Sequence, residues 1–95
     1  ANTLLVTNGG NLYVTDYVPV DGWVNFSSLI GSNTSATLNS VIVTGVGSTW
    51  TNSGSLAVGW GGAGNRLTIS NGGSVQNDFG SVGFHSSSSN NAVLI

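Results

Sequence analysis

The acid–base chemistry open to this chain rests on very few side chains. It has three acids, one arginine and one histidine, with no lysine, glutamate or cysteine: Asp16, Asp21, Asp78, Arg66 and His85. Inverting glycoside hydrolysis needs two carboxyl groups about 6.5–9.5 Å apart. When the chain is aligned on its repeats, Asp16 falls one position beyond Asp78, two turns away. Acids at the corners of a coil are more often turn residues, so the pair favours turn structure over a hydrolase.

The remaining ionisable side chains are isolated. Arg66 follows a corner asparagine and is expected to point to solvent. His85 is the single histidine and has no clustered acid or cysteine to complete a metal site, nor does it define a nucleophile–base pair among many serines. We therefore predict no enzyme, with no catalytic residue, no metal site and no cofactor. A fragment of a carbohydrate-active β-helix enzyme, with its site elsewhere in a longer chain, is the least favoured alternative.

Aromatic side chains are the better candidates for a binding surface. The candidates are Tyr17, Trp23, Trp50 and Trp60. Two of them fall in residues 17–25, a stretch with the single proline that interrupts an otherwise regular pattern. Exposed aromatics on an uncharged wall suit a glycan or a host surface protein. The alternative is that they cover the corners of a thin core.

Composition excludes several other partners. Charged residues make up 4% of the chain, against about 25% in typical globular proteins. One arginine without lysine cannot neutralise several phosphates, so nucleic-acid binding is excluded. The chain has no apolar run of about 18 residues, so we expect no membrane insertion in this segment. The repeat pattern runs through both ends of the sequence, and we expect the chain to be a segment of something longer.

A repeated strand pattern organises the chain. Two apolar positions spaced by two residues recur at successive intervals of 37, 26 and 26 residues, and the second is followed by Thr or Ser in the first three copies. This spacing is the period of a strand, and copies at a fixed interval indicate a coil that returns to the same place. The first apolar column is Leu4, Val41, Leu67 and Val93; the second is Val6, Val43, Ile69 and Ile95.

Asparagine and glycine fall in register with these strands. The asparagine column predicts an amide ladder, in which each side chain donates and accepts along the stack. The glycine column predicts tight corners that need a positive φ or a close backbone approach. The asparagines are Asn2, Asn39, Asn65 and Asn91, and the glycines are Gly10, Gly47 and Gly73.

Two further strands complete each turn. In the second strand, either Leu12, Thr49 and Val75 point inward or Tyr13 and Trp50 do; we favour the first choice, with the aromatics outside. In the third strand, the alignment places Leu56 with Val82 and Val58 with Phe84. The matching strand of the first turn is expected near residues 28–31.

The repeats resemble a known family. Residues 43–59 and 67–75 are similar to the glycine-rich repeat of autotransporter (type V secretion) passenger domains, which is also associated with PEP-CTERM surface proteins. The resemblance implies a right-handed parallel β-helix that is secreted or displayed at the cell surface of a Gram-negative bacterium. The family's repeat carries no catalytic residues.

The pattern and the resemblance together define the expected fold and function. We predict an all-β, right-handed parallel β-helix (β-solenoid) over residues 1–95, with about three and a half turns of roughly 26 residues and three short strands per turn. Turn 1 covers 1–38 with an insertion near 17–25, turn 2 covers 39–64, turn 3 covers 65–90, and 91–95 begin turn 4. The expected function is a structural stalk, adhesin shaft or self-associating fibre. The alternative is an adhesin module that binds a glycan or protein through 17–25 and the aromatics.

Overall fold

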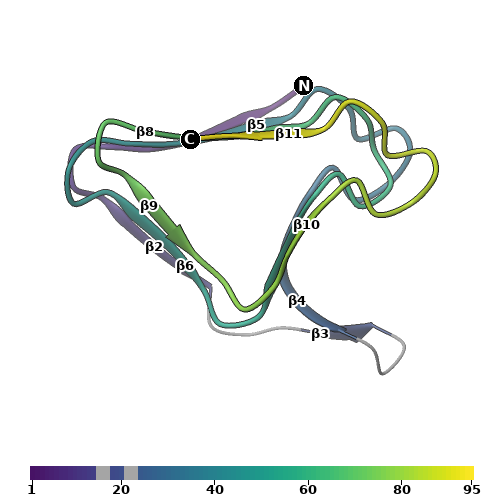
Figure 1. Cartoon of the computed structure of the whole chain (residues 1–95), viewed down its shortest axis with the longest axis horizontal. Coiled ribbons are helices and arrows are strands. Elements are labelled where there is room, and N and C mark those ends of the chain that lie inside the picture. Colours follow the sequence, from purple (N-terminus) through teal and green to yellow (C-terminus); the bar gives the residue numbers. More distant parts are fainter. Residues whose placement is uncertain (15–17, 21–23) are drawn as a thin grey trace.

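The chain forms three β-sheets that lie on three sides of a triangle when viewed down the shortest axis (Figure 1). The computed structural model describes the backbone of residues 1–14, 18–20 and 24–95, and the side chains outside residues 15–27. The first sheet contains β1 (Thr3–Val6), β5 (Ser40–Thr44), β8 (Arg66–Ser70) and β11 (Ala92–Leu94). The second contains β2 (Asn11–Val14), β6 (Thr49–Asn52) and β9 (Ser74–Gln76). The third contains β10 (Gly80–Val82), β7 (Ser55–Val58), β4 (Val24–Ile30) and β3 (Val18–Val20).

Strand order follows the sequence repeats. The chain visits the first, second and third sheets in turn, and strands from successive repeats pair in parallel. Among the described strands the one exception is β3, which pairs antiparallel with residues 24–26 of β4. Figure 1 shows β3 and the start of β4 outside the triangle. The protein is therefore all-β with parallel sheets, and no helix is present in the described ranges.

The core is built from alternate side chains of the three sheets. In β5 the burial alternates, so Val41 and Val43 point inward while Ile42 lies on the other face. The register places Leu4, Val41, Leu67 and Val93 in one column, which is the first apolar column expected from the sequence. The buried apolar cluster consists of Val6, Ile30, Val41, Val43, Trp50, Leu56, Val58 and Leu67.

The second strand corrects the predicted register. Leu12 pairs with Trp50, and Trp50 pairs with Val75, so the expected column of Leu12, Thr49 and Val75 is wrong at Thr49. Trp50 is 3% exposed and belongs to the core, whereas Tyr13 is 64% exposed. The shift arises because the corner before Trp50 is one residue longer than the corners before Leu12 and Val75. The prediction that Trp50 lies outside is therefore wrong.

The third strand also differs from its prediction by two residues. Val82 pairs with Val58 and Gly80 pairs with Leu56, so Leu56 and Val82 do not share a position. Phe84 lies beyond β10 and is exposed. Residues 28–30 of β4 pair with Leu56–Val58 as expected. The predicted and observed registers differ by two residues, so both place the same side chains on the inward face of the strand. Only the backbone pairing distinguishes one register from the other.

The glycines at the corners after the first strand of each repeat have two different structural roles. In the first and third repeats the left-handed residues are Asn8–Gly9 and Asn71–Gly72, one place earlier than the Gly10 and Gly73 predicted from the sequence. Both central residues of these turns have positive φ, which is the type I′ geometry. Gly73 serves a close approach instead, since a Cβ there would lie 2.6 Å from the Val43 carbonyl oxygen. Gly47 does have a positive φ, of 83°.

Candidate functional site

The asparagine column is the most regular polar feature of the molecule. The backbone N–H of Asn2 donates to Oδ1 of Asn39 at 2.9 Å, the N–H of Asn39 donates to Oδ1 of Asn65 at 2.9 Å, and the N–H of Asn65 donates to Oδ1 of Asn91 at 2.7 Å. Nδ2 of Asn39 also donates to Oδ1 of Asn65 at 3.0 Å. Each of these side-chain oxygens thus binds the backbone of the preceding strand in the first sheet and holds it in register. Asn65 is completely buried.

The amides of Asn65 and Asn91 also donate to backbone carbonyls at the third corner, the connection that follows the third strand of each repeat. Nδ2 of Asn65 donates to the carbonyl of Ala36, and Nδ2 of Asn91 donates to the carbonyl of Gly62, both at 3.0 Å. These carbonyls are 26 residues apart, so the acceptor repeats with the ladder. A buried amide with satisfied donors and acceptors stabilises the stack without the desolvation cost of an unpaired polar group.

Two glycines make room for these amides. A Cβ on Gly31 would overlap the side chain of Asn65, and a Cβ on Gly59 would overlap that of Asn91. Both glycines also have positive φ, of 75° and 81°. Sequence reasoning missed them, although a glycine directly follows the third strand in both repeats. Their shared place in the repeat is the signal that would have found them.

A third copy of this arrangement lies beside the edge strand β11. Gly83 has a φ of 75°, and a Cβ on it would lie 2.7 Å from the Ser88 carbonyl oxygen. The same distance separates a Cβ on Gly31 from the Ala36 carbonyl oxygen. Ser88 follows Ala36 and Gly62 at the same 26-residue interval. We call Gly83, the Ser88 carbonyl and the Asn91 backbone N–H the Gly83 site.

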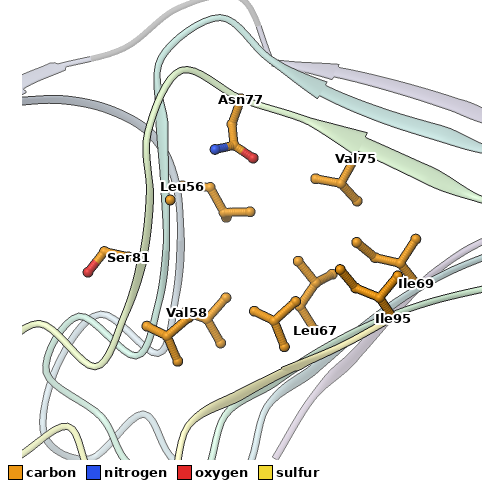
Figure 2. Close-up of a pocket in the computed structure, with 11 residues that line it drawn as sticks. Leu56, Val58, Leu67, Ile69, Val75, Asn77, Ser81 and Ile95 are labelled. Carbon is orange, nitrogen blue, oxygen red and sulfur yellow. The ribbon is translucent and has the colours of Figure 1, made fainter.

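Both ends of the sheets expose apolar side chains. At the β11 end, a hollow of about 240 Å³ lies inside the last strands. Figure 2 shows Leu56, Val58, Leu67, Ile69, Val75 and Ile95 around this hollow. At the β1 end, a second hollow of about 240 Å³ is lined by residues that include Leu4, Ile30 and Val41. The inward columns of the sheets therefore reach solvent at both ends.

An aromatic group lies at the third corner. The rings of Trp60 and Phe84 stack at 4.0 Å between centroids, and His85 meets both rings edge-on at 4.9 and 5.0 Å. The backbone N–H of His85 donates to the Trp60 carbonyl oxygen at 3.2 Å. This bond joins the third corners of two successive repeats. Trp60 thus lies in a different part of the molecule from the buried Trp50.

The other predicted surface residues and the acids are dispersed. Tyr17, Trp23, Asp16 and Asp21 lie outside the described residues. Asp78 is exposed at the second corner, where its N–H bonds to the Gly54 carbonyl. Thr51 pairs with Gln76, so Asp78 lies two residues beyond the last pair between β6 and β9. Arg66 is exposed on β8.

The described residues contain no group of three or more His, Cys, Asp or Glu side chains that could hold a metal ion. Across the same ranges, no helix is long and apolar enough to cross a membrane. Comparison of the chain with protein-family models, curated proteins and solved structures returned no match.

Proposed function

We propose that the chain is a segment of a right-handed parallel β-helix and works as a structural shaft that associates end to end. The observation that carries this proposal is the pair of apolar ends. Among the described strands, β1 and β11 each have one neighbour in their sheet, and the hollows beside them expose the core columns. A parallel stack with uncovered ends is driven to add strands, because pairing satisfies the backbone and buries apolar surface.

The regular ladder also suits a shaft. Core, asparagine and corner positions repeat through the first sheet with the same register, so each added strand meets the same surface as the last. The near absence of charge removes repulsion between stacked copies. From the resemblance to autotransporter passenger repeats, we propose that such a shaft is secreted or displayed on the surface of a Gram-negative cell as part of a stalk, adhesin or fibre.

Sedimentation velocity over a concentration series tests this function. We expect the sedimentation coefficient to rise with concentration, because end-to-end contacts obey mass action. The matched control is Val46→Ala, a change at an exposed corner of the second repeat, which should leave the series unchanged. A chain that sediments as a single monomer at every concentration would contradict the proposal.

The aromatic group favours a second candidate function, binding of a glycan. Flat rings on an uncharged surface suit the apolar face of a sugar, and Trp60, Phe84 and His85 form such a group at one corner. Glycan-array binding that is lost in Trp60→Ala and kept in Val46→Ala would support this function. Binding that is unchanged in Trp60→Ala would exclude the group as the site.

A further inference from the structure

Within the described part of the chain, the three sheets do not hold the same number of stacked strands. The first sheet has four parallel strands, in the order β1-β5-β8-β11. The second has three, and the third has three parallel strands with β3 beyond β4. Strand β11 therefore stands one strand spacing, about 4.8 Å, above the ends of the other two sheets. If a second copy simply added its β1 to this β11, the second and third sheets would each lack one strand at the junction.

Strand β11 has the same pattern as β1. Asn91 precedes Val93 by two residues, as Asn2 precedes Leu4. In the first sheet the backbone N–H of Ser40 donates to the Asn2 carbonyl at 2.9 Å, and the N–H of Ala92 donates to the Asn65 carbonyl at 3.0 Å. Both strands therefore have an asparagine that can bond to Asn39 and an inward apolar residue that can pack against Val41 of β5.

We infer that two copies join by strand replacement, in which β11 of one copy takes the place of β1 against β5 of the next. The inference rests on the proposed end-to-end function and names its contact. Each copy then contributes three strands to the stack in every sheet, so no gap is left. The β1 strand leaves the sheet, and its place on β5 is taken by a strand of the same pattern.

The inward columns continue across this junction. The pairing Leu12–Trp50–Val75 extends so that Leu12 of the second copy packs over Val75. The pairing Ile30–Val58–Val82 extends so that Ile30 of the second copy packs over Val82. In the first sheet Val93 packs against Val41 of the second copy, where Leu4 packed before. Apolar side chains thereby cover the hollow shown in Figure 2.

The hairpin outside the triangle leaves this edge accessible. Strand β3 pairs with residues 24–26 of β4, whereas β7 pairs with Phe26 and, after a register shift, with residues 28–30 of the same strand. Among the described strands none pairs with the second backbone edge of residues 28–30, so this edge can pair with β10 of another copy.

The Gly83 site receives the next asparagine of the ladder. With β11 in place of β1, Asn39 of the second copy is the side chain above Asn91. Its Oδ1 accepts from the Asn91 backbone N–H, as it accepts from Asn2 within one chain. Its Nδ2 donates to the Ser88 carbonyl, as Nδ2 of Asn65 does to Ala36. Gly83 supplies the space, as Gly31 does for Asn65.

A cysteine pair distinguishes replacement from simple addition. Leu94 pairs with Thr68, and Thr68 pairs with Ile42, so positions 94 and 42 of one chain are two strands, about 9.6 Å, apart. That separation is beyond the roughly 7 Å limit for a disulfide. In the inferred junction the same positions of two copies are neighbours, about 4.8 Å apart. The natural chain has no cysteine to interfere.

We expect the double variant Ile42→Cys with Leu94→Cys to form a ladder of disulfide-linked oligomers on mild oxidation, while each single variant forms none. A ladder from Leu5→Cys with Leu94→Cys, and none from the first pair, would show simple addition and overturn the inference. Dimers from a single variant would show a head-to-head contact and also overturn it. If the natural chain associates but neither pair cross-links, the inference fails and the proposed function stands. If the chain never associates, both fail.

Removal of residues 1–6 is the second test. Strand β1 competes with β11 of another copy, so its removal should lower the concentration for half-association by about tenfold or more. Removal of residues 91–95 should abolish association. Circular dichroism checks that both shortened chains keep their β-structure. Weaker association after removal of residues 1–6, in a chain that remains folded, would contradict strand replacement.

Discussion

The middle and the ends of this molecule contain the same residue types in the same register, and yet they differ in burial. Val58 and Val82 pair directly in the third sheet, but Val58 is 1% exposed and Val82 is 51% exposed. Leu67 and Leu4 share a column of the first sheet, but they are 2% and 44% exposed. Position in the stack, rather than residue type, therefore decides how deeply each of these side chains is buried, and we expect burial to set its contribution to stability.

The largest effect should come from truncation of the buried leucine. Leu67→Ala should lower the free energy of unfolding by about 3 kcal/mol, because it removes transfer energy and leaves a cavity. Leu4→Ala should cost less than about 1 kcal/mol, since its side chain already contacts water. Urea unfolding at a concentration where the chain is monomeric measures both. Equal losses would mean that the middle and the end of the column are packed alike.

A glycine pair separates close approach from backbone conformation. Gly59 and Gly9 both have positive φ, but only a Cβ on Gly59 would overlap another side chain, that of Asn91. Gly9→Ala should cost about 1 kcal/mol for the left-handed conformation alone. Gly59→Ala should cost about 2–3 kcal/mol because overpacking is added. Urea unfolding measures both losses. Equal losses would show that overlap with the Asn91 side chain does not add to the cost at Gly59.

An asparagine pair compares the ladder in the middle and at the end. Asn65→Ala removes the acceptor for two donors of Asn39, and we expect a loss of about 2 kcal/mol from the buried groups left unpaired. Asn2→Ala should cost less than about 0.5 kcal/mol because its side chain is exposed. Thermal unfolding of the two variants provides the measurement. A loss in Asn2→Ala as large as that in Asn65→Ala would contradict the ladder's dependence on burial.

The smallest effect concerns the aromatic group. Phe84→Ala removes the ring that stacks on Trp60, and we expect a loss of about 1 kcal/mol together with a change in tryptophan fluorescence. The matched control is Phe79→Ala, another exposed phenylalanine near the end of the stack, which should change neither quantity. An unchanged spectrum in Phe84→Ala would show that the stacking does not persist in solution.

The sequence predicts the first sheet well because several residue types recur together there. Asparagine, two apolar residues and a hydroxyl residue identify the same strand in the first three copies. The parallel pairing and the register of the first sheet follow from this pattern. The long third corner also keeps its 26-residue interval, which places the carbonyls of Ala36 and Gly62 at the same point of the ladder.

The other two sheets were harder to predict because their strands are short and ambiguous. Thr49, Trp50 and Thr51 contain a single apolar residue, so a one-residue change in the preceding corner reverses the inward face. In the third sheet, the sequence allows Val82 to align with either Leu56 or Val58, because both are apolar and lie two residues apart. The Gly83 site was not predictable from side chains, because its hydrogen-bonding groups are a backbone carbonyl and a backbone N–H.

The central claim is that the two apolar ends are joined by stacking of copies. Electron microscopy of the natural chain at high concentration tests it most directly. We predict filaments whose axial rise is about 14 Å per chain, equal to three strand spacings. Discrete particles of single-chain mass at every concentration would contradict the claim.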